Sequence, residues 1–311
     1  MPSDVANLRR CLLCDVPLET RFQSVFDAES GEVFSIESCP ECNFGATYPV
    51  PADLTQYYAA SYHGARHGVT NGLCNRRRQR FVWLAVGINQ RDKRLLDVGC
   101  GDGSFMITAE LAGYQVFGTE LAPEAPRSKG LEVETTHEKF DPSLKFDVIT
   151  LWHALEHFSD LDAMLQGLRK RLHAEGCLLI AVPDACSFQA RFFGSRWLHL
   201  DVPRHFWHFS RASLEKLLIR HRFDVVFLKA SEFEYDLMGW VQSLLDGWLA
   251  QPRGLMKLLT NRETSMPRSQ RWLHLAIGFS LFGILAAPVW LAGRMGRGGT
   301  LVVVAKPHCV D

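Results

Sequence analysis

The residues best able to do chemistry lie in and around the segment 95–105, Leu-Leu-Asp-Val-Gly-Cys-Gly-Asp-Gly-Ser-Phe. Glycines at alternate positions let the backbone turn sharply and approach a ligand more closely than a Cβ atom would allow. An apolar run enters the glycines and helix-compatible residues follow them, which is typical of a strand, a tight turn and a helix. Two acids, Asp97 and Glu120, each end a predicted strand beside this turn. The segment therefore predicts a ligand site at the start of a βαβ unit.

Two kinds of nucleotide site compete for this pattern. A dinucleotide site requires Gly-x-Gly-x-x-Gly, whereas this chain has Asp-x-Gly-x-Gly-x-Gly over residues 97–103. That form, with an acid ending the second strand, resembles the S-adenosylmethionine (SAM) site of class I methyltransferases. The resemblance implies that Glu120 accepts hydrogen bonds from both ribose hydroxyls, which suits its two oxygens. It also implies cofactor contacts in the turn itself, at Asp97, Gly99, Cys100 and Gly101. A glycine turn without a ligand is the structural alternative.

Two later segments extend the resemblance, which covers residues 54–230 and 300–306. Residues 146–158, FDVITLWHALEHF, are similar to the ubiquinone-biosynthesis type of small-molecule methyltransferase. Residues 203–210, Pro-Arg-His-x-x-His-Phe-Ser, together with the Ser-Leu-x-x-Leu-Leu stretch that follows, resemble the bacterial type 23 methyltransferase domains. The resemblance places the remaining cofactor contacts after the third and fourth strands, at His137, Leu151, Trp152 and His153.

One candidate base follows the fourth predicted strand. His157 lies one helical turn beyond His153, so both imidazoles can face one cleft. An imidazole titrates near neutrality and can accept a proton from a hydroxyl substrate. The alternative is that His157 and its neighbour Glu156 cap the next helix or pack structurally.

A second candidate lies in the long aromatic loop after the strand at 177–183, because a loop of this length beside a cleft commonly has a function. We expect Arg204 and His205 on the substrate side, with catalytic roles. The alternative is an internal hydrogen-bonded staple of Asp201, Arg204 and His205 that fixes the loop. Ser210 is expected to be the N-cap of the following helix.

Four of the nine cysteines form two Cys-x-x-Cys pairs near the N-terminus, with 24 residues between the pairs. Each pair suits a turn that points two thiolates at one tetrahedral ion, and a short hairpin fits between them. This is the sequence form of a zinc ribbon, in which no position is left for water, so the metal would be structural. The expected ligands are Cys11, Cys14, Cys39 and Cys42. Four unconnected cysteines are the alternative.

The amino-acid composition disfavours some kinds of function. Lys and Arg number 34, as do Asp and Glu, and apolar residues make up 47% of the chain. A neutral chain lacks the charge excess of a nucleic-acid binder. Paired cysteines without an apolar signal segment indicate metal binding in a reducing compartment rather than disulfides and secretion. We therefore expect a cytoplasmic protein, at the inner face of the membrane if the apolar segment described below contacts lipid.

The elements that must position these residues alternate regularly. Strands are expected at 94–98, 115–120, 131–134, 145–151, 177–183, 224–230 and 300–306. Helices are expected near 104–112, 122–129, 161–173 and 211–221. Strands separated by helices form a mainly parallel sheet covered on both faces. The predicted fold class is α/β, with a Rossmann-like, seven-stranded, mostly parallel sheet.

The predicted organisation has three parts. Residues 1–50 form the zinc ribbon, residues 51–90 a helical bridge or lid, and residues 91–311 the methyltransferase domain. Tyr57, Tyr62 and His63 are candidate lid residues, although a surface helix with a partly buried aromatic face explains them equally well. The basic run 76–80 is expected on a solvated helix face.

An apolar helical insertion at 231–297 precedes the last strand. Its segment 272–292 carries no formal charge over 21 residues, which is the length of a membrane span. The last strand, however, must return to the sheet that residue 230 left, and a single crossing would put it on the wrong side. An in-plane membrane contact through residues 238–293 satisfies both constraints. The alternatives are a buried cap or homodimer face, and a true span.

Taken together, the sequence favours a SAM-dependent methyltransferase with a structural zinc ion. The apolar insertion favours a small or lipid-linked, amphiphilic acceptor, with O-methylation preferred. A ribosomal or transfer RNA methyltransferase, in which the zinc ribbon recognises RNA, is an alternative that the balanced charge opposes. A non-catalytic SAM-binding scaffold is another, which the intact Asp97 and Glu120 oppose.

Overall fold

The computed structural model describes residues 10–51, 53–57, 68–87, 92–260 and 266–308, so the expected lid residues Tyr62 and His63 lie outside it. The chain divides into two compact units, each built from segments that are distant in sequence. Unit 1 comprises residues 1–67, 183–214 and 230–301. Unit 2 comprises residues 68–182, 215–229 and 302–311.

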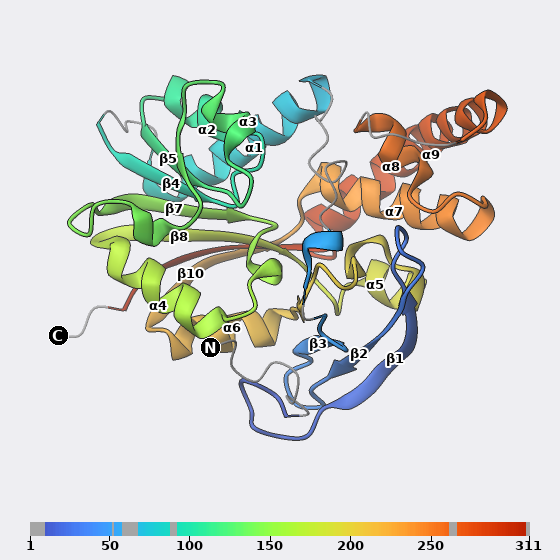
Figure 1. Cartoon of the computed structure of the whole chain (residues 1–311), viewed down its shortest axis with the longest axis horizontal. Coiled ribbons are helices and arrows are strands. Elements are labelled where there is room, and N and C mark those ends of the chain that lie inside the picture. The colour runs from blue at the N-terminus through green and yellow to red at the C-terminus, as the bar shows by residue number, and fades with distance from the viewer. Residues whose placement is uncertain (1–9, 52, 58–67, 88–91, 261–265, 309–311) are drawn as a thin grey trace. The chain divides into compact units, whose positions relative to one another are not determined.

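A seven-stranded sheet, nearly all of it in unit 2, has the strand order β10-β11-β8-β7-β4-β5-β6 (Figure 1). Its strands are β4 (Arg94–Val98), β5 (Gln115–Thr119), β6 (Glu132–Glu134), β7 (Phe146–Trp152), β8 (Leu172–Pro183), β10 (Phe223–Ala230) and β11 (Thr300–Pro307). β4 pairs in parallel with β5 on one side and β7 on the other, and the outer pairs β5–β6 and β7–β8 are also parallel. The strand order switches at β4, where ligands of such sheets bind. The predicted fold class is confirmed.

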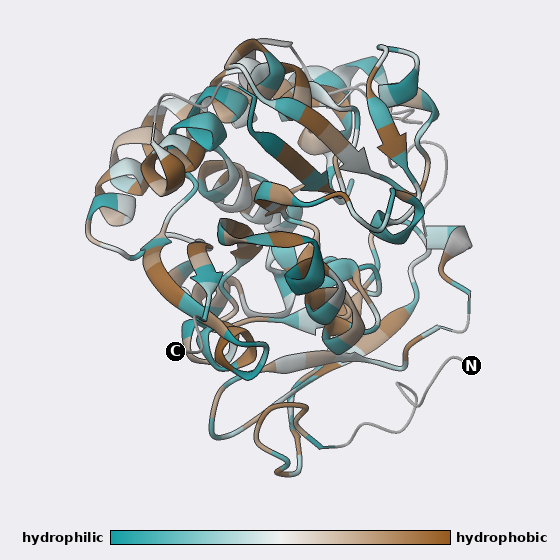
Figure 2. Ribbon diagram, turned by 90° about the vertical axis from the view of Figure 1, so that its left-hand side faces the viewer, coloured by the Kyte–Doolittle hydropathy of each residue, from teal (hydrophilic) through white to brown (hydrophobic). Residues whose placement is uncertain are grey.

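Helices cover both faces of this sheet. α1 (Gly68–Val86), α2 (Ser104–Leu111) and α3 (Glu124–Arg127) lie on one side, and α4 (Leu161–Arg171) and α6 (Arg211–Arg220) on the other (Figure 1). Short 3₁₀ turns follow β6 and β7, at His137–Lys139 and Leu155–His157. Because both faces of the sheet centre are covered, the central strands β4 and β7 are buried along most of their length, whereas the edge strands β6 and β10 are partly exposed. Figure 2 accordingly shows hydrophobic and hydrophilic segments along the strands. Phe81 and Val82 of α1 and Phe105 of α2 complete the core on one face.

Unit 1 contains a four-stranded antiparallel sheet of order β1-β2-β3-β9. Its strands are β1 (Glu19–Phe26), β2 (Val33–Ser38), β3 (Gly45–Tyr48) and β9 (Trp207–His208). The first three belong to the predicted ribbon, whereas β9 belongs to the Pro-Arg-His loop, with Gly45 opposite His208 and Ala46 opposite Trp207. The sequence assigned the ribbon and this loop to different domains; in the structure they share one sheet.

The rest of unit 1 is helical. Its elements are α5 (Phe188–Phe193), α7 (Phe233–Trp248), α8 (Gly254–Leu259) and α9 (Arg268–Arg294), with 3₁₀ turns at Thr55–Tyr57, Gly194–Arg196 and Leu198–Leu200. α9 packs along α7 and α8, around Leu237, Val241 and Leu255 (Figure 1). α9 is long and apolar enough to cross a membrane, and 11% of its most apolar stretch is buried. The predicted apolar helical insertion is therefore present.

Candidate functional site

The glycine-rich turn between β4 and α2 is held by backbone hydrogen bonds. The N–H groups of Gly99 and Cys100 both donate to the carbonyl oxygen of Thr119 on β5, at 2.8 and 3.0 Å. Gly99, Gly101 and Gly103 have φ values of +71°, +57° and +74°. Residues with a Cβ atom rarely adopt this left-handed conformation, so the turn requires glycine.

The three glycines have different surroundings. A Cβ atom at Gly99 would lie 2.8 Å from the Cβ atom of Ala154, and one at Gly103 would lie 2.4 Å from Leu131. These two glycines are therefore needed for packing within unit 2. A Cβ atom at Gly101 would meet nothing within 4 Å. Gly101 is thus the glycine of the turn that faces open space.

The carboxylate of Glu120 lies at this turn. Its Oε2 accepts a hydrogen bond of 2.8 Å from the N–H of Gly101, and its Oε1 accepts one of 2.8 Å from the N–H of Leu121. The side chain is only partly buried. Each carboxylate oxygen can accept a further hydrogen bond, so the group can hold two hydroxyls while the backbone fixes its orientation.

Asp97 lies beneath the turn. It is 2% exposed, and its Oδ1 accepts a 2.6 Å hydrogen bond from the hydroxyl of Thr150, the residue opposite it on β7. Burial raises the pKa of Asp97 to about 7, although the hydrogen bond from Thr150 and the charge of Arg78 oppose the rise. The predicted ligand residue is therefore held inside the sheet, where it braces β4 against β7.

Arg78 is a charged residue of this region that lies in a different environment from the one expected. The basic run was expected on a solvated helix face, yet Arg78 is buried and its guanidinium lies 5.1 Å from the ring centre of Trp152. The signal was present, because Asn71, Asn75 and Arg78 follow helical spacing and share the buried side of α1. A buried cation near Asp97 can bind an anionic ligand group.

Three predicted cofactor contacts pack into unit 2 instead of facing open space. Leu151 is fully buried within β7, and Trp152 joins the core under α1 and α2. The imidazole of His137 packs on α4, since a Cβ atom at Gly167 would lie 2.3 Å from its Nε2. Burial lowers the pKa of His137, so the ring is neutral. These side chains form part of the core, so a ligand would contact the backbone atoms of these residues.

The predicted base His157 ends the 3₁₀ turn after β7 and is half-buried. Two residues before this turn, His153 has a φ of +53°, a conformation that a residue with a side chain adopts at a cost. Its Nδ1 lies 3.9 Å from Oε1 of Glu156, which is completely buried. The turn therefore joins a strained histidine, a buried acid and His157 at the carboxyl end of β7.

Arg204, predicted on the substrate side, is completely buried in unit 1. Its Nη2 donates hydrogen bonds of 2.6 Å to both Asp27 and Asp201, and Arg253 also pairs with Asp201. This geometry matches the alternative interpretation, a staple that fixes the loop, and it leaves the guanidinium no exposed surface for a substrate. The catalytic role predicted for Arg204 is therefore replaced by a positioning role. Tyr57, a predicted lid residue, is buried beside it and its hydroxyl bonds Glu32.

His205 is also buried in unit 1, but its hydrogen bonding suits a base. Its Nδ1 lies 2.9 Å from the carbonyl oxygen of His199, which accepts the Nδ1 proton. The other ring nitrogen, Nε2, is 3.9 Å from a carboxylate oxygen of Asp201, so the ring lies between a carbonyl oxygen and an acid. His208, three residues on, is structural: burial lowers its pKa to about 3, and Thr47 contacts its Nε2. Ser210 caps α6 as predicted, through a 3.0 Å bond from the N–H of Ser213.

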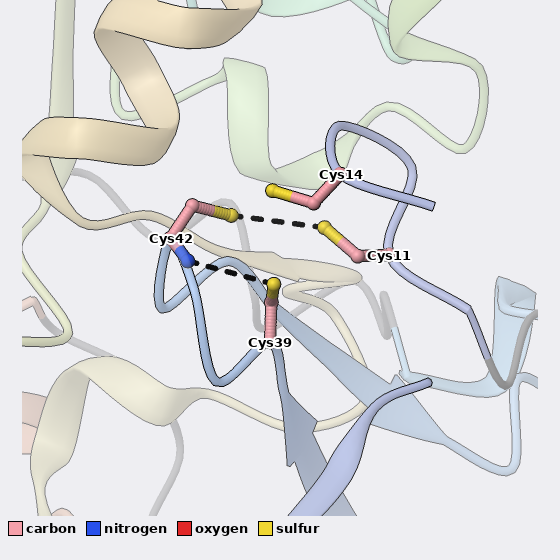
Figure 3. Close-up of side chains that lie close together, drawn as sticks. All are labelled: Cys11, Cys14, Cys39 and Cys42. Carbon is pink, nitrogen blue, oxygen red and sulfur yellow. Dashed lines mark hydrogen bonds between the residues drawn. The ribbon is translucent and has the colours of Figure 1, made fainter. Parts of the chain in front are cut away.

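The four cysteines of the N-terminal pairs converge in unit 1 (Figure 3). All four Sγ atoms lie within 4.8 Å of one another, and Cys11 and Cys42 are 3.7 Å apart. A disulfide would bring two sulfurs to about 2 Å. Zn–S bonds of about 2.3 Å in a tetrahedron give sulfur–sulfur distances of about 3.8 Å. The donor set and its spacing therefore fit a Zn²⁺ ion bound by Cys11, Cys14, Cys39 and Cys42.

Comparisons with known proteins agree with the geometry of unit 2. A family model described as a methyltransferase domain matches residues 66–227, just over half of the 311 residues. Ubiquinone biosynthesis O-methyltransferase of Rhodopseudomonas palustris is 26% identical over 143 residues, which cover 41% of this chain and 56% of that protein. The protein of the same name from Bartonella bacilliformis is 27% identical over 150 residues, which cover 43% and 60%. The chain thus spans less than two thirds of the length of these relatives.

Solved structures share the fold. One from Galdieria sulphuraria, provisionally described as a sarcosine dimethylglycine methyltransferase, superimposes with a TM-score of 0.50 and 12% identity. It covers 81% of this chain and 97% of that one. At this identity the likeness extends to the architecture alone.

Proposed function

We propose that this chain, which belongs to the class I SAM-dependent methyltransferases, transfers the SAM methyl group to a small or lipid-linked acceptor. The observation that carries the proposal is the hydrogen bond between Gly101 and Glu120. It places an acceptor pair beside the glycine that faces open space, so a ribose can lie against the turn with its hydroxyls on Glu120. The residues present therefore fit the cofactor.

Arg78 completes the proposed cofactor site. SAM carries a carboxylate at its methionine end, and an arginine guanidinium forms strong, charge-assisted hydrogen bonds with such a group. Arg78 is the buried cation whose charge acts on Asp97, at the end of the strand that leads into the turn. We assign the methionine carboxylate to Arg78 and the ribose to Glu120.

SAM supplies a methyl group on a positive sulfur, so transfer forms a bond from the acceptor to the methyl carbon as the sulfur–methyl bond breaks. The protein's main task is to hold the acceptor in line with that bond. An oxygen acceptor also loses a proton, which an imidazole can take. His157 and His205 are the candidates, and the hydrogen bond between Nδ1 of His205 and the carbonyl oxygen of His199 fixes the orientation of the His205 ring. O-methylation is favoured for this reason, and the relatives described above are themselves named O-methyltransferases.

The four cysteines bind one structural zinc ion in this proposal. The sulfurs occupy all four positions of a tetrahedral ion, which leaves none for a substrate. The metal would hold the turn after Cys39 against the first cysteine pair and thereby support β3, which follows it.

Binding of the cofactor tests the site directly. Isothermal titration calorimetry of S-adenosylhomocysteine should show binding to the natural protein and a loss of at least about 100-fold in affinity for Glu120→Ala, since two hydrogen bonds to a charged group disappear. Glu132→Ala, at an exposed position on β6, is the matched control and should bind normally. No heat with the natural protein, or equal affinity for both variants, contradicts the proposed site.

Labelled cofactor identifies the acceptor. Incubation with methyl-labelled SAM and fractionated lysate should place the label in the lipid or small-molecule fraction. Label in RNA would instead support the RNA methyltransferase alternative, and cofactor binding without transfer to any fraction would support a scaffold. His205→Ala should keep cofactor affinity and lower turnover; normal turnover would remove His205 from the mechanism.

A further inference from the structure

We propose that α9 lies in the plane of a membrane surface and binds a bilayer that contains anionic lipid. One side of α9 packs on α7 and α8, while the other is exposed and apolar over about five turns. Trp272, Phe279 and Trp290 are 73%, 59% and 53% exposed. Such large side chains seldom line up uncovered on a helix that only water contacts.

The exposed side chains form a single stripe. Trp272 and Trp290 are 18 residues apart, which is five complete turns, so they project in the same direction about 27 Å from each other. Phe279 lies within 20° of the same direction between them at 100° per residue. Ile284 and Leu291 lie about 120° and 100° further round the helix from Trp272, so the exposed apolar surface is broad. Ser280 is a polar residue of this surface, and its hydroxyl is already bonded to the carbonyl oxygen of Ala276. The stripe can therefore enter an apolar phase without leaving that group unsatisfied.

The positive charges at the two ends of the stripe indicate that it binds lipid with a negative headgroup. Arg268 and Arg271 precede the stripe and Arg294 and Arg297 follow it, and all four are exposed. The sequence has no Asp or Glu between Glu263 and Asp311. The Arg294 guanidinium also lies 4.9 Å from the ring centre of Trp290. Tryptophans at the level of the headgroups, with arginines beside them, are typical of a helix held at a membrane interface.

The packing of α9 favours an in-plane position over a span. His274 and Gly278 near its start, and Val289 and Gly293 near its end, are all buried, so unit 1 holds the helix along its whole length. Added Cβ atoms at Gly278 and Gly293 would lie 2.5 and 2.4 Å from Leu255 and Ser231, which shows how close this packing is. The N–H of Gly298 donates a 2.8 Å hydrogen bond to the carbonyl oxygen of Ala230, so the two ends of the insertion meet. A helix that crossed a bilayer would have to break both sets of contacts.

Flotation with vesicles tests the proposal on the full chain. The natural protein should float with phosphatidylcholine vesicles that contain roughly 30 mol% phosphatidylglycerol and bind pure phosphatidylcholine vesicles several-fold less. The double variant Phe279→Asp/Ile284→Asp should lower the partition coefficient by about tenfold or more, because carboxylates enter the interface poorly. Arg268→Gln/Arg294→Gln should remove most of the preference for the anionic vesicles.

Leu84→Asp/Leu111→Asp is the matched control, since both leucines are exposed on other helices, and it should float like the natural protein. Tryptophan quenching by lipids brominated at different depths separates the orientations: a shallow position of both Trp272 and Trp290 supports in-plane binding, and deep quenching contradicts it. The proposal also fails if the natural protein does not float, or if the double variant floats equally. A dimer that the double variant dissociates would show that a second copy covers the stripe.

Discussion

The N–H of Gly101 donates a hydrogen bond of 2.8 Å to Oε2 of Glu120, and so joins the tip of the glycine turn to the acid at the end of β5. The turn and the acid are 19 residues apart in sequence. Because the backbone N–H fixes one carboxylate oxygen, the group is oriented before a ligand arrives, which reduces the entropy lost on binding. Changes at either residue should therefore appear first in cofactor affinity.

Gly101→Ala should weaken SAM binding far more than it weakens the fold. The methyl group would project into the space proposed for the ribose, and the positive φ adds strain of about 1 kcal/mol. Gly130→Ala is a control with the same cost, because Gly130 has a φ of +79° and an equally open Cβ position. Calorimetry and urea unfolding of both variants separate the effects: we expect equal losses of stability, and a loss of affinity of at least about tenfold for Gly101→Ala alone. Equal affinities would show that the ligand avoids the turn.

Zinc removal should destabilise unit 1. We expect the purified protein to hold about one zinc ion per chain, and Cys39→Ser to lose it, because a hydroxyl is a poor ligand for this ion. Atomic absorption measures the metal, and thermal unfolding with and without a chelator measures its contribution. Cys186→Ser, at a half-buried cysteine outside the cluster, should keep the metal. Unfolding that a chelator leaves unchanged would exclude a structural metal.

Arg204→Met should destabilise the protein by about 3–5 kcal/mol, because it leaves the buried carboxylate of Asp27 without its partner. Burial alone would raise the pKa of Asp27, but the charge of Arg204 and the hydrogen bonds from Ser30 and Arg204 together hold it below its usual range, so this acid is ionised near neutrality. Asp27→Asn in the same chain removes the unpaired charge and should recover part of the loss in urea unfolding. If instead Arg204→Met unfolds normally and only turnover falls, Arg204 contacts substrate after all.

The contribution of Asp97 to the stability of the ligand-free protein should fall as pH rises from about 5 to about 8, against the opposite contribution of His208, whose pKa burial lowers to about 3. Burial raises the pKa of Asp97 to about 7 in the folded chain, against about 3.9 when unfolded, so the unfolded chain holds fewer protons in this range. The stability that Asp97 contributes is complete below the pKa that it has in the unfolded chain. This stability is lost as the pH rises through the pKa that Asp97 has in the folded chain. Asp97→Asn stays neutral, so in urea unfolding its stability relative to the natural protein should rise with pH across this range. Burial also raises the pKa of Asp236 to about 7, so Asp236 makes a similar contribution to the pH dependence of stability in this variant.

An unaltered slope in Asp97→Asn would mean that this carboxyl ionises freely in the folded protein. Asp102→Asn is the control, because hydrogen bonds from Ser104 and the charge of Lys129 outweigh burial and lower the pKa of Asp102, which is then ionised throughout the range. The slope of this variant should match that of the natural protein.

The sequence predicts the sheet of unit 2 well because its signals are local. The expected strand 94–98 and helix 161–173 appear as Arg94–Val98 and Leu161–Arg171. Apolar runs, glycine turns and caps such as Asp160, which accepts from the N–H of Ala163, mark these elements within a few residues of their ends. The cysteine cluster was predictable for the same reason, since ligand spacing is written in short motifs.

What the sequence does not reveal depends on partners that are distant along the chain. Arg204 and Asp27 are 177 residues apart, and the local sequence around each of them does not indicate that they form a buried pair. A two-residue strand such as β9 has no periodicity to detect. The side of α1 that buries Arg78 was visible as a helical spacing, but the run of arginines around it suggested solvent instead.

The pairing of β3 with β9 limits how this protein can be shortened. Phe44 stacks on Trp207 at 5.3 Å between ring centres, and the hydroxyl of Thr47 donates to the carbonyl oxygen of His205 at 2.7 Å. A truncated chain that starts after the cysteine module would lose both contacts and expose the edge of β9 to other chains. The cysteine-containing segment is thus an integral part of this unit, and we expect truncated chains that lack it to aggregate.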